Sequence, residues 1–516
     1  MYPQTVTFAG NDTLAINMNP TAKDIIERSV KQAARLFHEG NLHDCQLLIG
    51  HTLQADPFND EALQIAGLLK LRVGESADAV SLLEMARETA PSNPDHHNNL
   101  ALAYSKVGRY AEAVACLREA LAMAPGRQVF WVNLGVQLRH LANTKTPDAR
   151  EVMMKEAEEA VLKAIEIKPD YAQAHASLGS LYAEQKMLPQ AAVCYEKALS
   201  IDPAMSGVHV DLSYMYFLQG DFDKAWPHYE YRMQHYPQAS RWEKVFPTSK
   251  RWDGKTPLDD KTVIVFCEQG CGDAIHFARY IPLVKAGKLL ICCHDPLRGL
   301  MSQFGETYSM GAKTPAYDVS IPIMSLPLLL GKQQPAVPYI TMPQPAAGME
   351  SYAKTFNVGL CWAGNPQHPG DRFRSIPLRE FVPLGMEGVT LFSLQKDYRP
   401  RKYHDSDEIV DLCKDGPKIV DLSPLLTTFN DTANFVAAMD LVISVDTAVM
   451  HLAGALGRET WALIPYNPDW RWGLEGSSTP LYPSVELFRQ SEKNDWRSVM
   501  GRIGARLRDK AKPATI

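Results

Sequence analysis

Short amphipathic helical stretches fill the first half of the chain, and the breaks between them recur at a nearly fixed interval. The breaks are marked by Pro57, Pro91, Pro125, Pro169 and Pro203, which are separated by 34, 34, 44 and 34 residues. In helical repeats, small residues let the two helices of a unit approach, and larger ones fill the gap to the next unit. The hydrophobic pattern therefore predicts an α-solenoid.

A 34-residue period is typical of tetratricopeptide (TPR) repeats. Six units are predicted after an N-terminal segment of residues 1–25, within an array at 26–239: 26–59, 60–93, 94–127, 128–171, 172–205 and 206–239. The fourth has about ten extra residues, which we place in its turn and in a longer second helix. Such arrays present a concave face to an extended peptide or protein surface, unless they serve only as a scaffold or dimerisation element. His96 and His97 are expected to line this groove or to face solvent.

From residue 240 onward, short apolar and β-branched runs replace the helical period. After a loop-like linker at 240–261, strands are predicted at 262–266, 289–293, 317–323, 357–364, 390–395, 418–423, 441–445 and 460–465. Helical stretches between several of them predict parallel βαβ units. The Pro-rich stretch within 333–348 is the expected hinge between lobes at 240–345 and 346–516. The last helix of the second lobe could return to the first.

Polar or glycine-rich loops follow five of these strands, and ligands of parallel sheets bind beyond the strand carboxyl ends. The loops lie at 268–273, 362–365, 393–395, 446–447 and 465–472. The helix start at Thr447 offers backbone N–H groups and a favourable helix dipole to a phosphate. Alternatively, Asp446 or Thr447 simply caps this helix and His451 is structural. The five loops predict one shared site.

Composition narrows the function classes. A net charge of −6 and a pI near 6.2 give no general attraction to nucleic acid or anionic membranes, although a local basic groove stays open. The nine cysteines lack paired ligand spacing, which favours reduced thiols. The N-terminal segment lacks a basic region followed by an apolar one, and apolar runs fall short of about 20 residues. A cytoplasmic protein without a membrane span is expected.

Three segments behind the repeats resemble one enzyme family. They are EQGCGDAIHFARY (268–280), VGLCWAGNPQHPGDRFRSIPL (358–378) and DLVISVDTAVMHLAGALG (440–457). Together with the repeats they are similar to bacterial TPR-coupled glycosyltransferases, whose catalytic half resembles the heptosyltransferase family (glycosyltransferase family 9). The resemblance covers residues from about 30 to about 490. It implies a GT-B fold of two Rossmann-like lobes, and the layout is analogous to that of the eukaryotic O-GlcNAc transferase.

The resemblance also implies roles for individual residues. Asp273 matches the general base that takes the proton of the acceptor hydroxyl, although capping of the following helix is its other use. Thr447, Ala448 (where the family usually has Gly) and His451 match the segment that lies against the donor diphosphate. Arg374 is the candidate cation for the leaving diphosphate. Arg372 is second, and metal-independent chemistry is expected because no strand end carries a DxD-like motif.

The remaining candidates are expected to surround the nucleotide sugar: Gln269, Gly270, Gly272, Trp362, Gly364, Asn365, Gln395 and Asp446. Core packing is the alternative for Trp362, and His276 could face the same cleft as Asp273. The segment 470–472 could stack on the base, clamp the acceptor or fill the interface between the lobes.

The sequence thus predicts a nucleotide-sugar-dependent glycosyltransferase that needs no cofactor. It would act on a hydroxyl of a macromolecular acceptor, in the first place a protein recruited by the repeats. One alternative is a non-catalytic TPR adaptor with a degenerate GT-B half. Another is a transferase acting on a glycan or a modified nucleic-acid base. The sequence does not determine which nucleotide the donor carries or whether the chain forms a homodimer.

Overall fold

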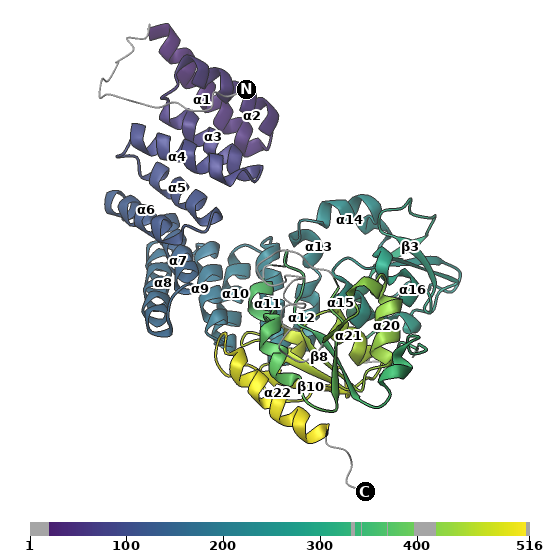
Figure 1. Cartoon of the computed structure of the whole chain (residues 1–516). Coiled ribbons are helices and arrows are strands. Elements are labelled where there is room, and N and C mark those ends of the chain that lie inside the picture. The colour runs from purple at the N-terminus through teal and green to yellow at the C-terminus, as the bar shows by residue number, and fades with distance from the viewer. Residues whose placement is uncertain (1–19, 332–335, 342, 369, 397–418, 512–516) are drawn as a thin grey trace. The chain divides into compact units, whose positions relative to one another are not determined.

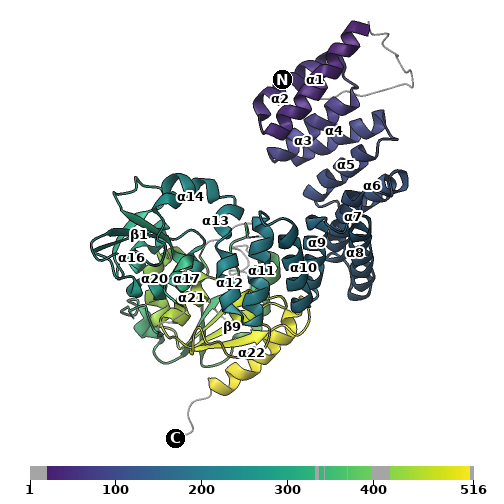
Figure 2. The same ribbon diagram turned by 180° about the vertical axis from the view of Figure 1, so that it is seen from behind.

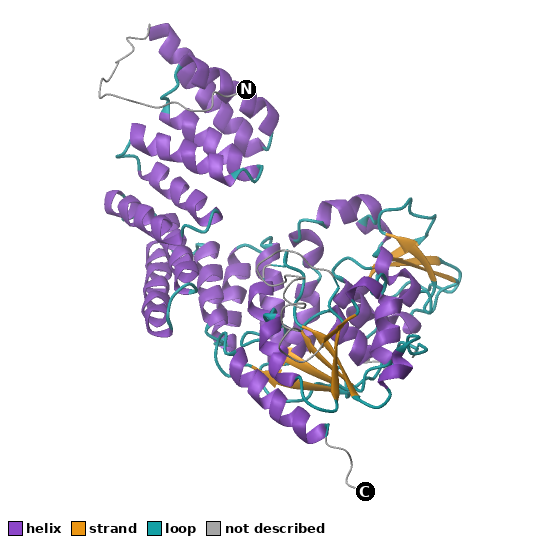
Figure 3. Cartoon of the chain, viewed as in Figure 1, coloured by secondary structure: helices purple, strands orange, loops and turns teal. Residues whose placement is uncertain are grey.

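The computed structural model describes residues 20–331, 336–341, 343–368, 370–396 and 419–511, which fall into two compact units, residues 1–203 and 204–516 (Figure 1). The described part of the first unit is helical, and all described strands lie in the second (Figure 3). The chain therefore combines a helical repeat region with an α/β region, as predicted.

Ten helices form the described part of the first unit, two for each of five repeats. They are α1 (Pro20–Glu39), α2 (Leu42–Ala55), α3 (Asp60–Arg72), α4 (Ser76–Thr89), α5 (Pro94–Lys106), α6 (Tyr110–Met123), α7 (Gln128–Ala142), α8 (Pro147–Ile167), α9 (Ala172–Glu184) and α10 (Leu188–Ile201). The extra residues of the fourth repeat lie in α8, which has 21 residues where α6 and α10 have 14.

Close contact between the two helices of a unit explains the small residue at the eighth position of several repeats. A Cβ atom added to Gly135 would lie 2.5 Å from Cγ2 of Val161 and 2.9 Å from the carbonyl oxygen of Ala157. A Cβ atom at Gly67 would lie 2.6 Å from Cγ of Leu83. Interiors packed this closely leave no room for another carbon atom.

The expectation that His96 and His97 line a groove or face solvent is wrong, because both side chains are buried in α5. Nε2 of His96 lies 2.8 Å from the Asp60 carboxylate, on the first helix of the preceding repeat. Nε2 of His97 lies 2.8 Å from the carbonyl oxygen of Pro91. These imidazoles satisfy polar groups inside the array, as buried polar groups require.

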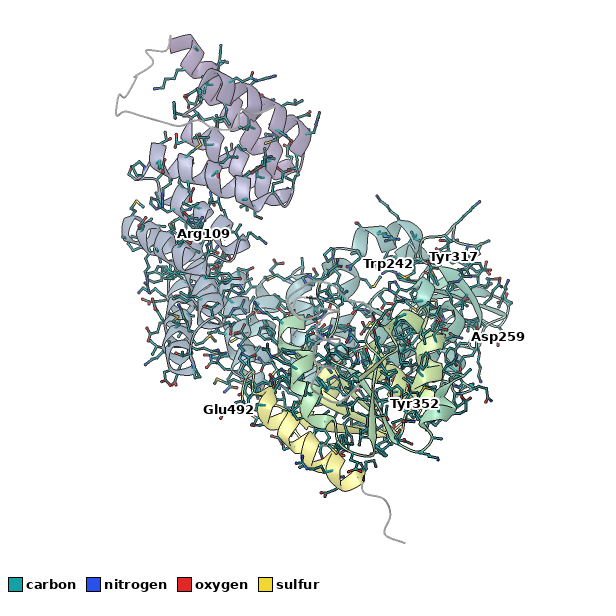
Figure 4. All side chains as sticks on the ribbon, viewed as in Figure 1. Arg109, Trp242, Asp259, Tyr317, Tyr352 and Glu492 are labelled. Atoms are coloured by element: carbon teal, nitrogen blue, oxygen red, sulfur yellow. The ribbon has the colours of Figure 1, made fainter. Side chains whose placement is uncertain are left out.

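The sixth helix pair, α11 (Ser206–Gln219) and α12 (Phe222–Tyr229), belongs to the second unit. It leads into α13 (Arg232–His235), α14 (Ala239–Val245) and η1 (Thr248–Lys250). The prediction of a loop-like linker at 240–261 is therefore wrong over its first residues. The reason is aromatic packing, since Trp242 and Phe246 cover the neighbouring sheet and Phe246 stacks on Phe266 at 4.2 Å. Figure 4 labels Trp242 of α14 and Tyr317, which packs against the same aromatic cluster.

The N-terminal lobe contains a parallel four-stranded sheet of order β3-β2-β1-β4. Its strands are β1 (Thr262–Phe266), β2 (Lys288–Cys293), β3 (Glu306–Ser309) and β4 (Val319–Pro322). Its helices are α15 (Cys271–Phe277), η2 (Ala278–Leu283), η3 (Asp295–Leu297), α16 (Arg298–Met301), η4 (Ile323–Ser325) and α17 (Leu326–Leu329). The strand order reverses between β1 and β4, so the loop after β1 begins at a topological switch point. The edge strand β3 was not predicted, because its sequence ETYS has no apolar run.

The C-terminal lobe contains a parallel six-stranded sheet of order β10-β9-β8-β5-β6-β7. Its strands are β5 (Phe356–Cys361), β6 (Val389–Ser393), β7 (Ile419–Asp421), β8 (Leu441–Val445), β9 (Thr460–Ile464) and β10 (Val485–Arg489). Its helices are η5 (Met349–Tyr352), α18 (Asp371–Arg374), η6 (Leu378–Leu384), η7 (Ser423–Leu425), α20 (Phe429–Ala437), α21 (Ala448–Ala455), η8 (Trp470–Trp472) and α22 (Trp496–Lys510). The switch point lies between β5 and β8. The two lobes have the arrangement of the GT-B fold.

The last helix, α22, stays on the C-terminal lobe, so a return to the N-terminal lobe is contradicted (Figure 2). Val499, Ile503 and Leu507 repeat every four residues along α22 and form one apolar face. That face joins the core cluster of Phe381 and Leu384 beside the sheet. Across the described residues, no helix combines the length and the apolar character needed to cross a bilayer.

Candidate active site

The switch points of the two lobes meet where α15 packs against α21. A Cβ atom added to Gly272 would lie 3.1 Å from Cδ2 of His451 and 3.5 Å from Cα of Ala448. The hydroxyl of Tyr339, from the predicted hinge, donates to the carbonyl oxygen of Ile275 at 2.9 Å. The predicted acceptor loop and the predicted donor segment thus lie side by side.

Asp273 lies on the first turn of α15 and has two partners. Its Oδ2 accepts a hydrogen bond from the N–H of Gly270 at 3.1 Å, which caps the helix. Its Oδ1 accepts one from Nη2 of Arg471 at 2.6 Å. The side chain keeps 24% of its surface exposed, so solvent or a substrate hydroxyl can reach it. Asp273 can therefore cap the helix and still accept a proton from a substrate hydroxyl.

Arg471 is the main site residue whose role the sequence did not define. Its side chain is only 7% exposed, and Nη1 donates to Oδ1 of Asp469 at 2.8 Å while Nη2 reaches Asp273. The motif PDWRW at 468–472 drew attention to this segment. However, the partner carboxylate of Asp273 lies 198 residues away in the chain, and no local pattern could identify it.

The start of α21 has no side-chain cap among the described residues. Thr447 occupies the N-cap position, but its hydroxyl turns back to Ser444 Oγ at 3.1 Å. Backbone N–H groups of the first helical turn, which begins at Ala448, thus lack the usual side-chain acceptor. An anion is the partner that such a helix start favours.

Beside this helix start, Oδ1 of the partly buried Asp446 lies 3.8 Å from Nε2 of the buried His451. Burial raises the pKa of Asp446 to about 6, Asp469 adds to the rise, and Arg374 opposes it. Burial, followed by Arg471 and Arg279, holds the pKa of His451 well below its usual range. His451 is thus a neutral imidazole at pH 7.

The hydroxyl of Tyr482 links two histidines that the sequence analysis singled out. It lies 3.0 Å from Nδ1 of His451 and 3.3 Å from Nδ1 of His276. Burial, followed by the charge of Arg279, also holds the pKa of His276 well below its usual range. The Tyr482 hydroxyl thus connects a histidine of one lobe to a histidine of the other by hydrogen bonds. Nothing in the sequence around Tyr482 indicated this role.

Of the two candidate arginines, Arg374 lies at the switch point of the C-terminal lobe. Its Nη1 donates to the carbonyl oxygen of Asp446 at 2.9 Å, and its Nε donates to Asp371 at 3.2 Å. A Cβ atom added to Gly364 would lie 2.6 Å from the Arg374 guanidinium, so this glycine makes room for the cation. Arg372 is exposed, with its guanidinium over the ring of Phe373.

Of the other predicted residues, some hold the backbone of a loop, some lie in the core and some are exposed. Oε1 of Gln395 accepts hydrogen bonds from the N–H groups of Trp362 at 3.2 Å and Ala363 at 3.0 Å, which fixes the loop after β5. The Trp362 side chain lies in the lobe core, the alternative stated for it. Asn365 is exposed and accepts from the N–H of Gln367.

Gln269 faces the last helix pair, since its Nε2 donates to the hydroxyl of Tyr229 at 3.1 Å. Within the described ranges, no group of three or more His, Cys, Asp or Glu side chains is arranged to hold a metal ion. Metal-independent chemistry remains a prediction.

Comparison with known proteins agrees with this architecture. The glycosyltransferase family 9 (heptosyltransferase) profile matches residues 384–498, and the tetratricopeptide repeat profile matches residues 94–126 and 172–205. Protein FlbA of Caulobacter vibrioides is 26% identical over 486 residues, which cover 86% of this chain and 77% of FlbA. The family 9 match includes Asp446, His451 and Arg471, whereas Asp273 and Arg374 precede it.

Similar solved structures include the TPR protein TTC0263 of Thermus thermophilus, with a TM-score of 0.33 and 19% identity, covering 36% of this chain and 95% of that one. PilF of Pseudomonas aeruginosa gives a TM-score of 0.34 and 15% identity, covering 43% and 97%. The profile matches and the helix pairs, rather than these low scores, establish the repeats. The chain thus carries tetratricopeptide repeats and a glycosyltransferase domain of the heptosyltransferase class.

Proposed function

Because the chain joins tetratricopeptide repeats to a glycosyltransferase family 9 domain, we propose that it transfers a sugar from a nucleotide-diphosphate sugar to a hydroxyl of a macromolecular acceptor. The observation that carries this proposal is the meeting of a partly exposed carboxylate, Asp273, with the uncapped start of α21. The carboxylate can accept a proton and the helix start can hold a phosphate, and the reaction requires both.

In the proposed reaction, the acceptor oxygen forms a bond to the anomeric carbon of the donor sugar. The bond from that carbon to the diphosphate oxygen breaks, and the diphosphate leaves with the bonding electrons. The acceptor proton passes to Asp273, for which a carboxylate within hydrogen-bond reach is suited. The first N–H groups of α21 and the guanidinium of Arg374 stabilise the charge that develops on the leaving diphosphate.

The acceptor is proposed to be a protein held by the repeats, because solenoids of this class bind extended peptides on their concave face. The cytoplasm is the proposed location, and the donor needs no metal in this mechanism. Neutral His451 contributes by hydrogen bonding beside the diphosphate and not as a cation, since its pKa lies well below the usual range.

The test begins with a panel of UDP-, GDP- and ADP-sugars and measures thermal stabilisation and release of the nucleoside diphosphate. A donor at a hundredfold excess over Kd stabilises the folded chain by about 2.7 kcal/mol. Asp273→Asn should keep this stabilisation and lose release by at least about a hundredfold, the range of general-base catalysis. His451→Ala should lose the stabilisation.

The matched control is Asp260→Asn, which removes a carboxylate of the same lobe whose side chain is 77% exposed. It should leave both readouts unchanged. Stabilisation of the wild type by a donor without any release of nucleoside diphosphate would contradict catalysis. No stabilisation by any donor would favour the non-catalytic adaptor.

A further inference from the structure

The segment η8 connects three parts of the second unit through three consecutive side chains. The ring of Trp470 stacks on Phe217 of α11 at 4.1 Å with an interplanar angle of 19°. It also meets Trp226 of α12 edge-on at 5.8 Å. On the other side, Trp472 stacks on His451 at 5.4 Å. The last helix pair of the repeats therefore contacts the segment that reaches the predicted donor site.

Between these two tryptophans, Arg471 reaches the N-terminal lobe. Its guanidinium carbon lies 4.7 Å from the ring centre of Trp470 and 5.6 Å from that of Phe277, so aromatic faces enclose it. Within this enclosure it joins Asp469 at 2.8 Å to Asp273 at 2.6 Å. Buried charges of this kind are costly to desolvate, and the enclosure leaves the guanidinium little freedom to turn.

The last repeat holds the loop that carries Asp273 by a second route. Nη2 of Arg232, just after α12, donates to Oε1 of Glu268 at 2.8 Å, and both side chains are buried. The hydroxyl of Tyr229 accepts from Gln269 at 3.1 Å. Residues 268 and 269 lead directly into the turn that presents Asp273. Both ends of the Arg471–Asp273 ion pair are thus fixed by α11, α12 and Arg232 at the start of α13.

We propose that Arg471 is a positioning residue that aims the carboxylate of Asp273, and that the last helix pair holds Arg471 in place through Phe217 and Trp470. The final repeat is then part of the active site and not only a connection to it. This inference rests on the proposed function, in which Asp273 accepts the acceptor proton. Misplacement of a catalytic group by about 1 Å can cost about a hundredfold in rate.

The first arm of the test measures kcat, KM and Kd for the donor that the panel identifies, using the full chain. Arg471→Met should lower kcat by about 10- to 100-fold and change the donor Kd by less than about threefold, because the lost ion pairs are to Asp273 and Asp469 and not to α21. Arg471→Lys should recover part of the loss, since an ammonium can reach one carboxylate but cannot join two in a fixed fork.

The hydrogen-exchange measurement of the second arm needs no donor, and its kcat measurement uses the donor of the first arm. Phe217→Leu should raise deuterium uptake in peptides covering 268–277 and 466–475, and should lower kcat in the same direction as Arg471→Met. The matched control is Phe130→Leu, which shortens an equally buried aromatic residue on α7 of the first unit. The control should lower the stability of the first unit without raising uptake in either peptide.

The outcomes separate this inference from the proposed function. An active wild type with unchanged kcat in Arg471→Met, or equal uptake in Phe217→Leu and wild type, overturns the positioning role and leaves the transferase intact. A kcat loss in Phe130→Leu as large as that in Phe217→Leu also overturns it. An inactive wild type with every donor overturns the proposed function, and the positioning role of Arg471 falls with it, whatever the exchange measurement gives.

Discussion

The two compact units of the chain differ in whether they bury charged side chains. Among the described residues of the first unit, no Lys, Arg, Asp or Glu is buried, and ion pairs such as Arg118–Glu156 lie on the surface. The second unit buries Arg232, Glu268, Arg279 and Asp371. Repeats gain stability by packing small apolar residues, whereas the catalytic half accepts the desolvation of charges that fix loops around the site.

The largest expected effect concerns Arg232, the buried arginine at the start of α13. Arg232→Met should lower the free energy of unfolding of the second unit by about 3–5 kcal/mol, because it leaves the buried Glu268 carboxylate without its charged partner. Arg139→Met breaks a pair with Glu184 in the first unit whose side chains are 21% and 24% exposed, and should cost about 1 kcal/mol or less.

Urea unfolding of the full chain, followed by hydrogen exchange, assigns each loss to its unit. Similar losses for the two variants would mean that burial does not distinguish the charges of the two units.

An effect of intermediate size is expected from the carboxylate beside the predicted diphosphate site. The pKa of Asp446 is raised from 3.8 to about 6 in the folded chain, so the folded state holds the proton more tightly than the unfolded state. Stability from this group is therefore present at low pH and is lost as pH rises through about 6. At pH 7.5, ionisation of Asp446 should lower the free energy of unfolding by about 3 kcal/mol.

Asp446→Asn removes this titration. Its free energy of unfolding relative to wild type should rise between pH 4 and pH 7.5, as measured by urea unfolding at both values. A constant difference between the two proteins across this range would show that Asp446 titrates alike in the folded and unfolded states. Affinity for the donor should fall in wild type, but not in the variant, as pH rises through about 6, because an ionised carboxylate repels the diphosphate.

The smallest effects probe the packing of the repeats. Gly135→Ala should destabilise the first unit by about 1–3 kcal/mol, because the new carbon atom meets the α8 backbone at Ala157. Gly50→Ala places a methyl group on α2 where no atom lies within 4 Å, and should stabilise by about 0.5–1 kcal/mol. Thermal unfolding of both variants measures the difference, and a loss of stability in Gly50→Ala would contradict this account of the repeats.

Local patterns carried the parts of the fold that the sequence analysis predicted. The repeats were visible because the two helices of each unit approach closely, so position 8 of the unit needs a small residue in every repeat. Strands such as β8 were visible because a strand buried on both faces is continuously apolar. The edge strands β3 and β10 and the helix α14 were missed. The sequence of β3, ETYS, has no apolar run, and that of β10, VELFR, contains two charged residues. Helix α14 was missed because its helical form follows from aromatic packing on the sheet, such as that of Phe246 on Phe266.

At the site, the sequence singled out loops from both lobes but could not assign the contacts between them. It named Asp273, Arg374, Asp446 and His451 from motifs, and the structure brings these residues to the two switch points. It gave no sign that burial raises the pKa of Asp446 and lowers that of His451, since burial depends on the packing of both lobes.

The sequence by itself determined the repeat period, the parallel α/β order and the strand ends at which a ligand would bind, because these follow from periodicity and chain direction. Only the tertiary structure decided that the sixth repeat packs into the catalytic half and that Arg471 reaches Asp273. Such contacts join residues about 200 positions apart, and their energy depends on distance and burial, neither of which a one-dimensional pattern contains.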